Sequence, residues 1–527
     1  MFVITQTCCS DAACVSVCPV NCIHPTPEER GFGSSDILHI DPEACIDCGA
    51  CADACPVDAI YPADKLGTRD KVFIDINASY YRDNTDVTSG WTPITYPVIP
   101  KLPAGQRIAV VGTGPSGGYA LRSLLDRTTA DITVIDKLPT PGGLVRAGVA
   151  PDHPGTKKVL RGFDILYRDP RVTLVTNVEV GEDTAAGGQV SPAELADHFD
   201  AVFYAVGASD SRQLGIPGED LNGSTSATDL VAWYNAAPSV ADAQVLRHNN
   251  TGRVVVVGTG NVALDVARIL VSPPELLATT DIADRALEVL RRQNVREVVL
   301  LGRRDQAGAA YSAAEYRALN SIPGVDVVVE NDPGVISDDS GVADPTARRI
   351  VFRFHSAPEE ILGDSWVSGV RVRTGATSHV IAADLVVRSI GYRSTPIAGL
   401  PFDQQRGVFP NDDGRLLDTN GDAIPGSYVL GWAKRGPTGG IGANKVCAEA
   451  TVDEFLIDAE KGLLSGRSHG QKHFESLLRQ RKAPVIGYRG VRAIDRAERR
   501  RGEELNRPRV KFTSVPDMVK AAGRRKR

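Results

Sequence analysis

The chain has 527 residues, 42% of them hydrophobic, and a formal net charge of −6. This length exceeds what one hydrophobic core accommodates and predicts roughly three or four domains. Nine of the ten cysteines lie within the first 55 residues, which argues against a secreted disulfide scaffold and favours metal ligation in a reducing cytoplasm. We see no signal peptide and no apolar run of membrane-spanning length, so we expect a cytoplasmic protein without a membrane partner.

The N-terminal cysteines form two runs with nearly the same spacing. The run from Cys45 to Pro56 reads Cys-x-x-Cys-x-x-Cys-x-x-x-Cys-Pro. The run from Cys8 to Pro19 repeats it, except that Asp11 stands where the second cysteine would be. Such spacing is typical of iron–sulfur proteins with two clusters, in which the fourth cysteine of each run ligates the other cluster. A zinc site or a disulfide framework would also use cysteines, but zinc needs four ligands per site and no crossed pattern.

The crossed pattern predicts two clusters that are not equivalent. A [4Fe-4S] cluster is predicted on four thiolates, which are Cys18, Cys45, Cys48 and Cys51. Three thiolates remain for the other cluster, and they are Cys8, Cys14 and Cys55. This second site should hold [3Fe-4S], or [4Fe-4S] if the Asp11 carboxylate ligates the fourth iron, and we favour the three-iron form.

The cysteine pattern resembles that of bacterial-type two-cluster ferredoxins. In three-iron members of that group, the cysteine that corresponds to Cys22 lies near a cluster without ligating it, and we interpret Cys9 as a packing residue.

Residues 1–85 contain 13 acidic and 5 basic residues, whereas residues 491–527 contain 13 basic and 5 acidic ones. An acidic electron carrier would be steered toward a less acidic partner, although ordinary solvated surface explains the same charges. The basic tail lacks interleaved aromatic residues, so no nucleic-acid partner is expected.

A proline-rich segment at residues 82–104 predicts an extended linker after a cluster domain at residues 1–81. From Gln106 onward the pattern is strand, glycine turn, helix. Buried strands are predicted at 107–111, 132–135, 201–206, 254–257, 297–301 and 385–389, with helices at 118–127 and 262–270. This alternation predicts a doubly wound α/β fold.

Two glycine-rich turns each follow an apolar strand and precede a helix. The first contains Gly112, Gly114, Pro115 and Gly117, and the second contains Gly258, Gly260, Asn261 and Val262. Glycines let the backbone approach a pyrophosphate, and the helix N-terminus offers free N–H groups. Two such turns in this context predict two dinucleotide sites.

The residues after the next strand distinguish the two sites. Asp136 follows the first turn, and a carboxylate there accepts hydrogen bonds from ribose hydroxyls and repels a 2′-phosphate, as suits FAD or NAD. Arg303 and Arg304 follow the second turn, and two guanidinium groups suit the 2′-phosphate of NADP. The spacing to these arginines is longer than usual, which we attribute to an inserted segment at residues 273–294.

Three further strings, at residues 139–153, 260–268 and 431–442, resemble the adrenodoxin reductase-like ferredoxin–NADP reductases. Together with the cysteine runs, the resemblance covers nearly the whole chain. It implies an α+β ferredoxin domain followed by an α/β, Rossmann-like flavoprotein reductase with two dinucleotide-binding domains. The implied parts of the reductase are a discontinuous FAD domain at 105–208 and 375–460, an NADP domain at 209–374, and a C-terminal extension with the basic tail at 461–527.

The resemblance also implies individual roles. The FAD site would include Asp136, Leu144, Trp432, Gly439, Gly440 and Ile441. The NADP site would include Arg212, Asn261, Val262, Arg303, Arg304, Glu315 and Gly439. His153 would face the contact between nicotinamide and flavin, where an imidazole positions the ring or moves a proton, or else it is a structural histidine. Family members often carry a second carboxylate where this chain has Ala318, which puts a shared proton relay in doubt.

The resemblance implies an NADPH-dependent ferredoxin reductase. Because NADPH gives a hydride and a cluster takes one electron, FAD must stand between them. Electrons would then reach the fused clusters and an external ferredoxin or monooxygenase-type acceptor. A disulfide reductase needs a redox-active cysteine pair, yet residues 56–527 contain only Cys447. The pattern also leaves open a glutamate-synthase small-subunit-like electron-input module and a non-enzymatic redox sensor or cluster carrier.

Overall fold

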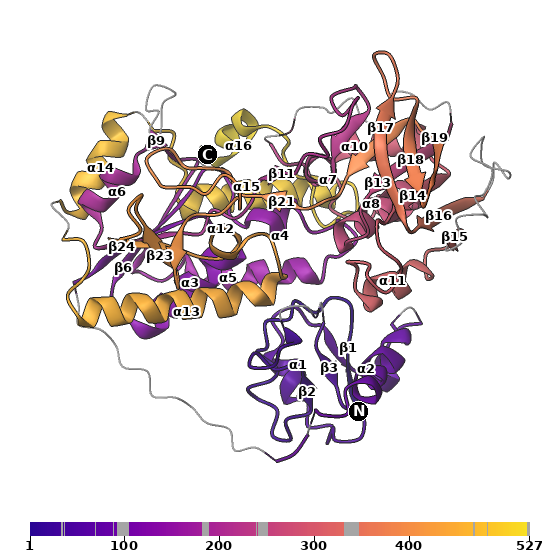
Figure 1. Cartoon of the computed structure of the whole chain (residues 1–527). Helices are drawn as coiled ribbons and strands as arrows, with labels where there is room; N and C mark the ends of the chain where they lie inside the picture. Colours follow the sequence, from indigo (N-terminus) through magenta and orange to yellow (C-terminus); the bar gives the residue numbers. More distant parts are fainter. Residues whose placement is uncertain are drawn as a thin grey trace.

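The computed structural model describes residues 1–32, 35, 37–68, 70–87, 89–91, 105–181, 189–238, 240, 251–330, 347–466, 469–481 and 483–523. Most of the predicted linker, from residue 92 to residue 104, lies outside the described residues, as do the last four residues of the basic tail. Figure 1 shows a small N-terminal unit beside a larger body built around two sheets.

The N-terminal unit consists of short strands and helices around the cysteine runs. β1 (Phe2–Ile4) pairs with β4 (Ile60–Pro62) and β2 (Ile23–His24) pairs with β3 (His39–Ile40), both antiparallel, and the helices are α1 (Ala50–Ala54), η2 (Ala63–Lys65) and α2 (Val72–Asp83). Asn77 of α2 is fully buried and joins these strands. Its Oδ1 accepts hydrogen bonds from the N–H groups of Ile4 at 3.1 Å and Ile40 at 2.9 Å. A buried amide with such partners fixes β1 and β3 against the helix.

The first large sheet carries the first glycine turn. Its strand order is β22 (Asn411–Asp412), β23 (Arg415–Leu417), β24 (Ala423–Val429), β10 (Ala201–Tyr204), β5 (Arg107–Val111), β6 (Asp131–Asp136) and β7 (Val172–Thr176). The strands from β24 to β7 are parallel. Helices α3 (Pro115–Arg127) and α13 (Ile441–Glu460) pack against each other along this sheet (Figure 1).

The second large sheet is entirely parallel and carries the second glycine turn. Its order is β12 (Ser224–Ser226), β20 (Leu385–Arg388), β13 (Arg253–Val257), β14 (Glu297–Leu301), β16 (Arg348–Arg353) and β15 (Val325–Glu330). Its helices are α7 (Ala227–Tyr234), α8 (Asn261–Val271), α9 (Pro274–Leu277), α10 (Asp284–Arg292) and α11 (Ala313–Leu319). The predicted insertion at 273–294 contains α9 and α10, which explains the long spacing before Arg303.

A three-stranded antiparallel sheet adjoins the second large sheet, and the chain then returns to the first. The small sheet contains β17 (Ser356–Leu362), β18 (Gly369–Thr374) and β19 (Thr377–Ala382). The segment predicted to return at residue 375 includes β20, yet β20 pairs in parallel with β13 of the second sheet. The chain therefore returns after Arg388, through β21 (Tyr392–Arg393), which pairs with the outgoing β11 (Asp210–Ser211).

The strands predicted from apolar runs are present with small differences at their ends. The predicted helix at 118–127 begins earlier, at Pro115, because proline is well suited to the first helical position. The remaining elements are α4 (Gly143–Ala147), η3 (Thr156–Lys158), α5 (Val159–Leu166), β8 (Glu179–Val180), β9 (Gln189–Val190), α6 (Pro192–His198), α12 (Trp432–Arg435), α14 (Gln471–Gln480), α15 (Tyr488–Glu503) and α16 (Val515–Ala522). None of the helices in the described part of the chain is both long and apolar enough to cross a membrane.

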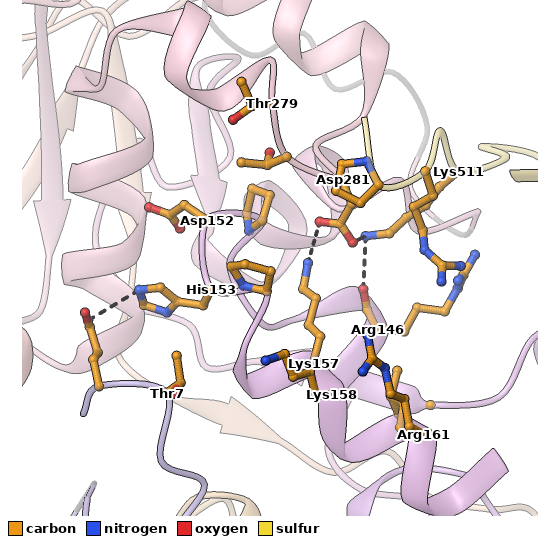
Figure 2. Close-up of a pocket in the computed structure, with 18 of the residues that line it drawn as sticks. Thr7, Arg146, Asp152, His153, Lys157, Lys158, Arg161, Thr279, Asp281 and Lys511 are labelled. Atoms are coloured by element: carbon orange, nitrogen blue, oxygen red, sulfur yellow. Dashed lines mark hydrogen bonds and ion pairs between the residues drawn. The ribbon is translucent and has the colours of Figure 1, made fainter. Parts of the chain in front are cut away.

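A buried lysine of the C-terminal extension and a half-buried lysine of the first segment of the body meet at one carboxylate. Lys157 Nζ and Lys511 Nζ lie 2.7 Å and 2.9 Å from the Asp281 carboxylate (Figure 2). Burial, together with the positive charge of the nearby Lys157 and against the opposing effect of Asp281, lowers the pKa of Lys511 from its ordinary value of 10.5 to about 7. One carboxylate compensates one ammonium group well, so the second ammonium is costly to bury.

We expect Lys511 to make the stability of the body depend on pH. Between about pH 7 and pH 10.5 the unfolded chain keeps the Lys511 proton and the folded chain has lost it. The free energy of unfolding should therefore rise with pH, by up to about 1.4 kcal/mol per unit in this window. Lys511→Met should flatten this rise in a pH series of thermal unfolding, whereas Lys461→Met, at an exposed position, should leave it intact. Equal pH profiles for wild type and Lys511→Met would contradict the shift.

Candidate cofactor sites

The four thiols predicted to share one cluster line a single cavity. Its walls include Cys18, Cys45, Cys48 and Cys51 together with apolar side chains such as Phe2, Val20, Ile23 and Ile40. Cys22 also lines this cavity, with its Sγ 3.5 Å from that of Cys18. The fold thus brings the last cysteine of the first run to three cysteines of the second run, as a crossed pattern requires. All ten cysteines are free thiols, which is inconsistent with a disulfide framework.

The three remaining thiols lie outside that cavity and close to one another. Burial raises the pKa of Cys8 to about 11 and that of Cys14 well above its ordinary value, and Cys55 and Asp11 add to both shifts. Backbone N–H groups donate to two of these sulfurs, from Ser10 to Cys8 at 3.3 Å and from Ala59 to Cys55 at 3.2 Å. Thiols that are buried, close together and provided with amide donors fit the ligands of a cluster.

Asp11 lies between this thiol group and the reductase body. Its Oδ1 accepts a hydrogen bond from Ala13 N at 3.2 Å. Burial raises the pKa of Asp11, and the positive charges of Lys445 and Arg122 oppose that rise.

Cys9 is buried in the hydrophobic cluster beneath the first large sheet, as the packing interpretation predicts. Within the described part of the chain, the thiols do not form a group of three within 4.8 Å, the spacing that a single ion would need.

The first glycine turn is closed by contacts that only glycine permits. Gly112 has φ +107°, and a Cβ there would lie 2.4 Å from the carbonyl oxygen of Ala205. A Cβ on Gly117 would lie 2.0 Å from the carbonyl oxygen of Gly112. Gly114 is the N-cap of α3, with Pro115 as its first helical residue. The turn therefore brings a helix N-terminus, with its free N–H groups, to the carboxyl end of β5.

A second helix N-terminus meets the first at this place. Gly440 is the N-cap of α13, and Ile441 is its first residue. Ser116 Oγ of α3 donates a hydrogen bond to Asn444 Oδ1 of α13 at 2.9 Å, which ties the two helices together. The predicted FAD residues of both chain segments are thereby brought to one edge of the first sheet.

Asp136 is buried at the end of β6 and holds the first turn in place. Its carboxylate accepts hydrogen bonds from the N–H groups of Thr113 at 2.9 Å and Leu138 at 2.8 Å, and it also contacts the Thr113 hydroxyl. Burial raises the pKa of Asp136, and these hydrogen bonds oppose the rise. Leu144 lies in α4, directly after the Gly142 N-cap of that helix.

The segment that contains Thr438 and Gly439 positions Trp432. Its Nε1 donates hydrogen bonds to the carbonyl oxygens of Thr438 and Gly439, each at 3.1 Å. Its ring centroid lies 5.3 Å from that of Tyr392. Gly439 has φ +75°, so a residue with a side chain would be strained there. These contacts fix Trp432 beside the N-terminus of α13.

The second glycine turn repeats the construction of the first. Gly258 has φ +123°, and a Cβ there would lie 2.2 Å from the carbonyl oxygen of Ser389. Gly260 is the N-cap of α8, and open space lies in front of it. Asn261 Oδ1 accepts a hydrogen bond from Ser312 N at 2.9 Å, and Val262 packs against the core of the second sheet.

The predicted basic residues of this second site are at the surface. Arg303 and Arg304 are exposed directly after β14, next to the strand that carries the turn. Arg212 is exposed as well, and its N–H donates to the carbonyl oxygen of Gly391 at 3.2 Å, where the chain crosses between the sheets. Exposed guanidinium groups beside an open helix N-terminus suit a phosphate ligand.

His153 lies in a charged cluster between the two sheets. Its nearest ligand atom and those of Asp265 and Glu315 all lie within 4.8 Å of one another. Burial lowers the pKa of His153, and Arg268 lowers it further, so the imidazole is favoured in its neutral form. The Arg268 guanidinium group binds Asp152 at 2.7 Å and Asp265 at 2.6 Å. Figure 2 shows Asp152 and His153 side by side.

The sequence did not predict that a residue of the N-terminal unit would complete this cluster. Gln6 Nε2 donates a hydrogen bond to Glu315 Oε2 at 2.7 Å and lies 3.3 Å from His153 Nε2. No motif contains Gln6, because its role comes from docking between units and not from a local pattern. Arg268 and Asp265 lie within the family-like string at residues 260–268, but nothing in the spacing indicated that they face His153.

Comparison with known proteins agrees with this arrangement. Residues 106–431 match the family described as pyridine nucleotide-disulphide oxidoreductase, and residues 38–61 match a 4Fe-4S binding domain. A probable ferredoxin/ferredoxin--NADP reductase of Mycobacterium tuberculosis is 45% identical, over 99% of this chain and 94% of the relative. The NADPH:adrenodoxin oxidoreductase of Arabidopsis thaliana is 36% identical, over 79% of this chain and 95% of the relative. The structure of Mycobacterium tuberculosis FprA in complex with NADPH has a TM-score of 0.71 at 40% identity, covering 79% of this chain and 99% of that one.

The chain is therefore an oxidoreductase of the pyridine nucleotide-disulphide oxidoreductase class. Within that class it belongs to the ferredoxin–NADP reductases of the adrenodoxin reductase-like type that carry an N-terminal ferredoxin segment. This membership confirms the family and the NADPH-dependent ferredoxin reductase activity predicted from the sequence, and it argues against a non-enzymatic sensor or carrier.

Proposed function

We propose that this chain passes electrons from NADPH through FAD to two iron–sulfur clusters in its own bacterial-type ferredoxin domain, and from there to an external ferredoxin or monooxygenase-type acceptor in the cytoplasm. The [4Fe-4S] cluster would be held by the four thiols that share one cavity, and the [3Fe-4S] cluster by Cys8, Cys14 and Cys55. The observation that carries this proposal is the contact of Gln6, two residues before Cys8, with both His153 and Glu315.

The proposed division of the reductase follows its two sheets. FAD would occupy the edge where the N-termini of α3 and α13 meet, and NADPH would occupy the turn at Gly258 with its 2′-phosphate near Arg303 and Arg304. A bound flavin would supply the chemistry that accepts a hydride and releases single electrons. Helix N-termini would hold the pyrophosphates, and Trp432 would exclude water from the flavin site.

His153 would act mainly by position. It is partly buried, its pKa is lowered by burial, and its Nε2 lies near the Gln6 amide. A neutral imidazole can orient the nicotinamide without adding a positive charge beside the hydride donor. Because Ala318 occupies the place of the second carboxylate, a proton relay from His153 would depend on Glu315 and Asp265 instead.

Anaerobic titration of the purified full-length chain with NADPH tests the proposal. Flavin absorbance should bleach, and the paramagnetic resonance signal of an oxidised three-iron centre should disappear in the same titration. A protein without bound flavin, or a bleached flavin beside unchanged clusters, would contradict it. A lone chain that reduces no added acceptor until a second subunit is supplied would favour an electron-input module.

Replacing Asp11 with cysteine tests the three-iron assignment. Asp11→Cys restores the complete four-cysteine run and should convert the site to [4Fe-4S], because the missing thiolate is then present. The three-iron resonance of the oxidised protein should vanish, and the iron content should rise by one atom per chain. Asp11→Asn is the matched control and should keep the three-iron signal. Loss of a four-iron centre in Asp11→Asn would instead indicate that the carboxylate is a ligand.

A further inference from the structure

The segment Thr5–Asp11 of the N-terminal unit touches the reductase body. Gln6 contacts Glu315 of α11, and Thr156 Oγ1 donates to the carbonyl oxygen of Thr7 at 3.5 Å. Lys445 Nζ of α13 donates to the carbonyl oxygen of Asp11 at 2.9 Å. Figure 1 shows the unit lying beside α11 and the adjacent end of α13.

This contact is too close for ordinary side chains at its centre. A Cβ on Gly442 would lie 1.5 Å from the carbonyl oxygen of Ser10, and a Cβ on Gly155 would lie 2.3 Å from the Thr7 side chain. Gly442 follows Gly440 and Ile441, which begin α13 at the proposed flavin site. The two surfaces are therefore shaped for each other, and they meet next to the place where the flavin would lie.

The same contact brings one thiol group to the reductase and leaves the other away from it. Cys8 and Cys55, from the three-thiol group, pack against the hydrophobic cluster beneath the first large sheet. The four-thiol cavity is instead lined by the core of the N-terminal unit. Its rim opens to solvent at Cys48, which is exposed, and at Ile46, which is 48% exposed.

The surface around this open rim is acidic. Glu43, Asp47 and Asp53 are exposed before, between and after Ile46 and Cys48 in the sequence, and Asp47 pairs with the N-terminal ammonium group of Met1 at 2.7 Å. Between residues 31 and 64 the sequence contains no lysine or arginine. An exposed apolar patch surrounded by acidic residues suits a partner with a basic surface, because complementary charge raises the rate at which two proteins associate. The reductase itself contacts an acidic residue of the unit with a basic one, since Lys158 pairs with Asp58 at 2.9 Å.

We propose that the three-thiol site is the inner centre and the four-thiol site the outer centre, and that the outer rim at Glu43, Ile46, Cys48 and Asp53 docks a basic one-electron acceptor protein. This inference rests on the proposed function. One NADPH yields NADP⁺, a proton and two electrons. The two electrons pass singly through the inner and then the outer centre, so that two acceptor molecules are each reduced by one electron.

The first test measures docking at the rim with cytochrome c, a basic one-electron haem protein, as the probe. In the full-length holoenzyme, Glu43→Lys/Asp53→Lys should lower kcat/KM for NADPH-dependent cytochrome c reduction at least about tenfold at low ionic strength, and high salt should remove the difference. Reduction of ferricyanide, a small anion that needs no such rim, should be unchanged. The matched control, Glu28→Lys/Asp83→Lys, makes the same charge change at exposed positions of the same unit and should behave as wild type.

The second test measures the order of the centres by paramagnetic resonance. Cys45→Ala removes an outer ligand, and NADPH should still abolish the three-iron signal in that variant while cytochrome c reduction falls at least about tenfold. An inner signal that persists after NADPH in Cys45→Ala, or wild-type cytochrome c kinetics in the Lys variants, would overturn the inference. If purified Cys45→Ala shows no three-iron signal before NADPH is added, the inference is tested by cytochrome c reduction in Glu43→Lys/Asp53→Lys alone.

Failure of the proposed function gives a different result from failure of this inference. Failure of the proposed function leaves the wild-type flavin unbleached by NADPH, or bleached beside unchanged wild-type clusters. Failure of this inference leaves the wild-type flavin bleached and the wild-type clusters reduced, but with cytochrome c reduction insensitive to the charge of the rim or with the three-iron signal of Cys45→Ala unaffected by NADPH.

Discussion

Replacing both Arg303 and Arg304 with leucine should raise the KM for NADPH roughly a hundredfold and leave the KM for NADH nearly unchanged. A charge-assisted hydrogen bond contributes roughly 1.5–3 kcal/mol, so the loss of two guanidinium groups from one phosphate supports this magnitude. Both arginines are exposed and neither lies within the sheet, so the substitution should not disturb the fold. Steady-state kinetics with both nucleotides and a fixed concentration of ferricyanide measures the ratio.

The matched control for this pair is Arg292→Leu/Arg406→Leu, which removes the same charge at exposed positions outside the turn. It should change neither KM by more than about twofold, since distant surface charges are screened by salt. A loss of equal size for NADPH and NADH in the Arg303/Arg304 variant would mean that these residues do not read the 2′-phosphate.

Local patterns in the sequence predicted those parts of the molecule that depend on neighbouring residues. The strand β5 and the turn at Gly112 were predictable because a buried parallel strand, a glycine turn and a helix start follow one another along the chain. The crossed cysteine arrangement joins Cys18 to the distant Cys45, yet it was predictable because each run carries the spacing and the proline that are typical of two-cluster ferredoxins. In both cases the signal is a pattern of residues close in sequence, even where the contacts it implies are not.

Contacts between distant segments were not predictable in this way. Strand β20 pairs with β13 across about 130 residues, and nothing within residues 375–388 distinguishes it from a strand of the first sheet. Lys511 lies near Asp281 only because α15 and α16 fold back onto the body. No sequence motif marks Gln6, since its contacts with His153 and Glu315 depend on how the N-terminal unit docks against the reductase body. Topology and docking therefore set the limit of what the sequence reveals here.

Replacing Gly112 with valine should yield a chain that purifies with at least about tenfold less flavin. The residue has φ +107°, and the new Cβ would lie 2.4 Å from the carbonyl oxygen of Ala205. Backbone strain of this kind costs roughly 1–3 kcal/mol, and a backbone atom cannot move aside as a flexible side chain can. The N-terminus of α3 would be pushed away from the place where the pyrophosphate would bind. Flavin released by heat, measured per chain, gives the occupancy.

Gly105 provides a control that separates strain from collision. It has a similar φ of +116°, but a Cβ there meets nothing within 4 Å. Gly105→Val should therefore keep its flavin, whereas Gly112→Val should lose it. Iron content should stay normal in both variants, because the thiols lie in the N-terminal unit and Asn77 holds that unit together independently of the turn. Full flavin occupancy in Gly112→Val would contradict the expectation that the turn at Gly112 brings the N-terminus of α3 close to the pyrophosphate of the flavin.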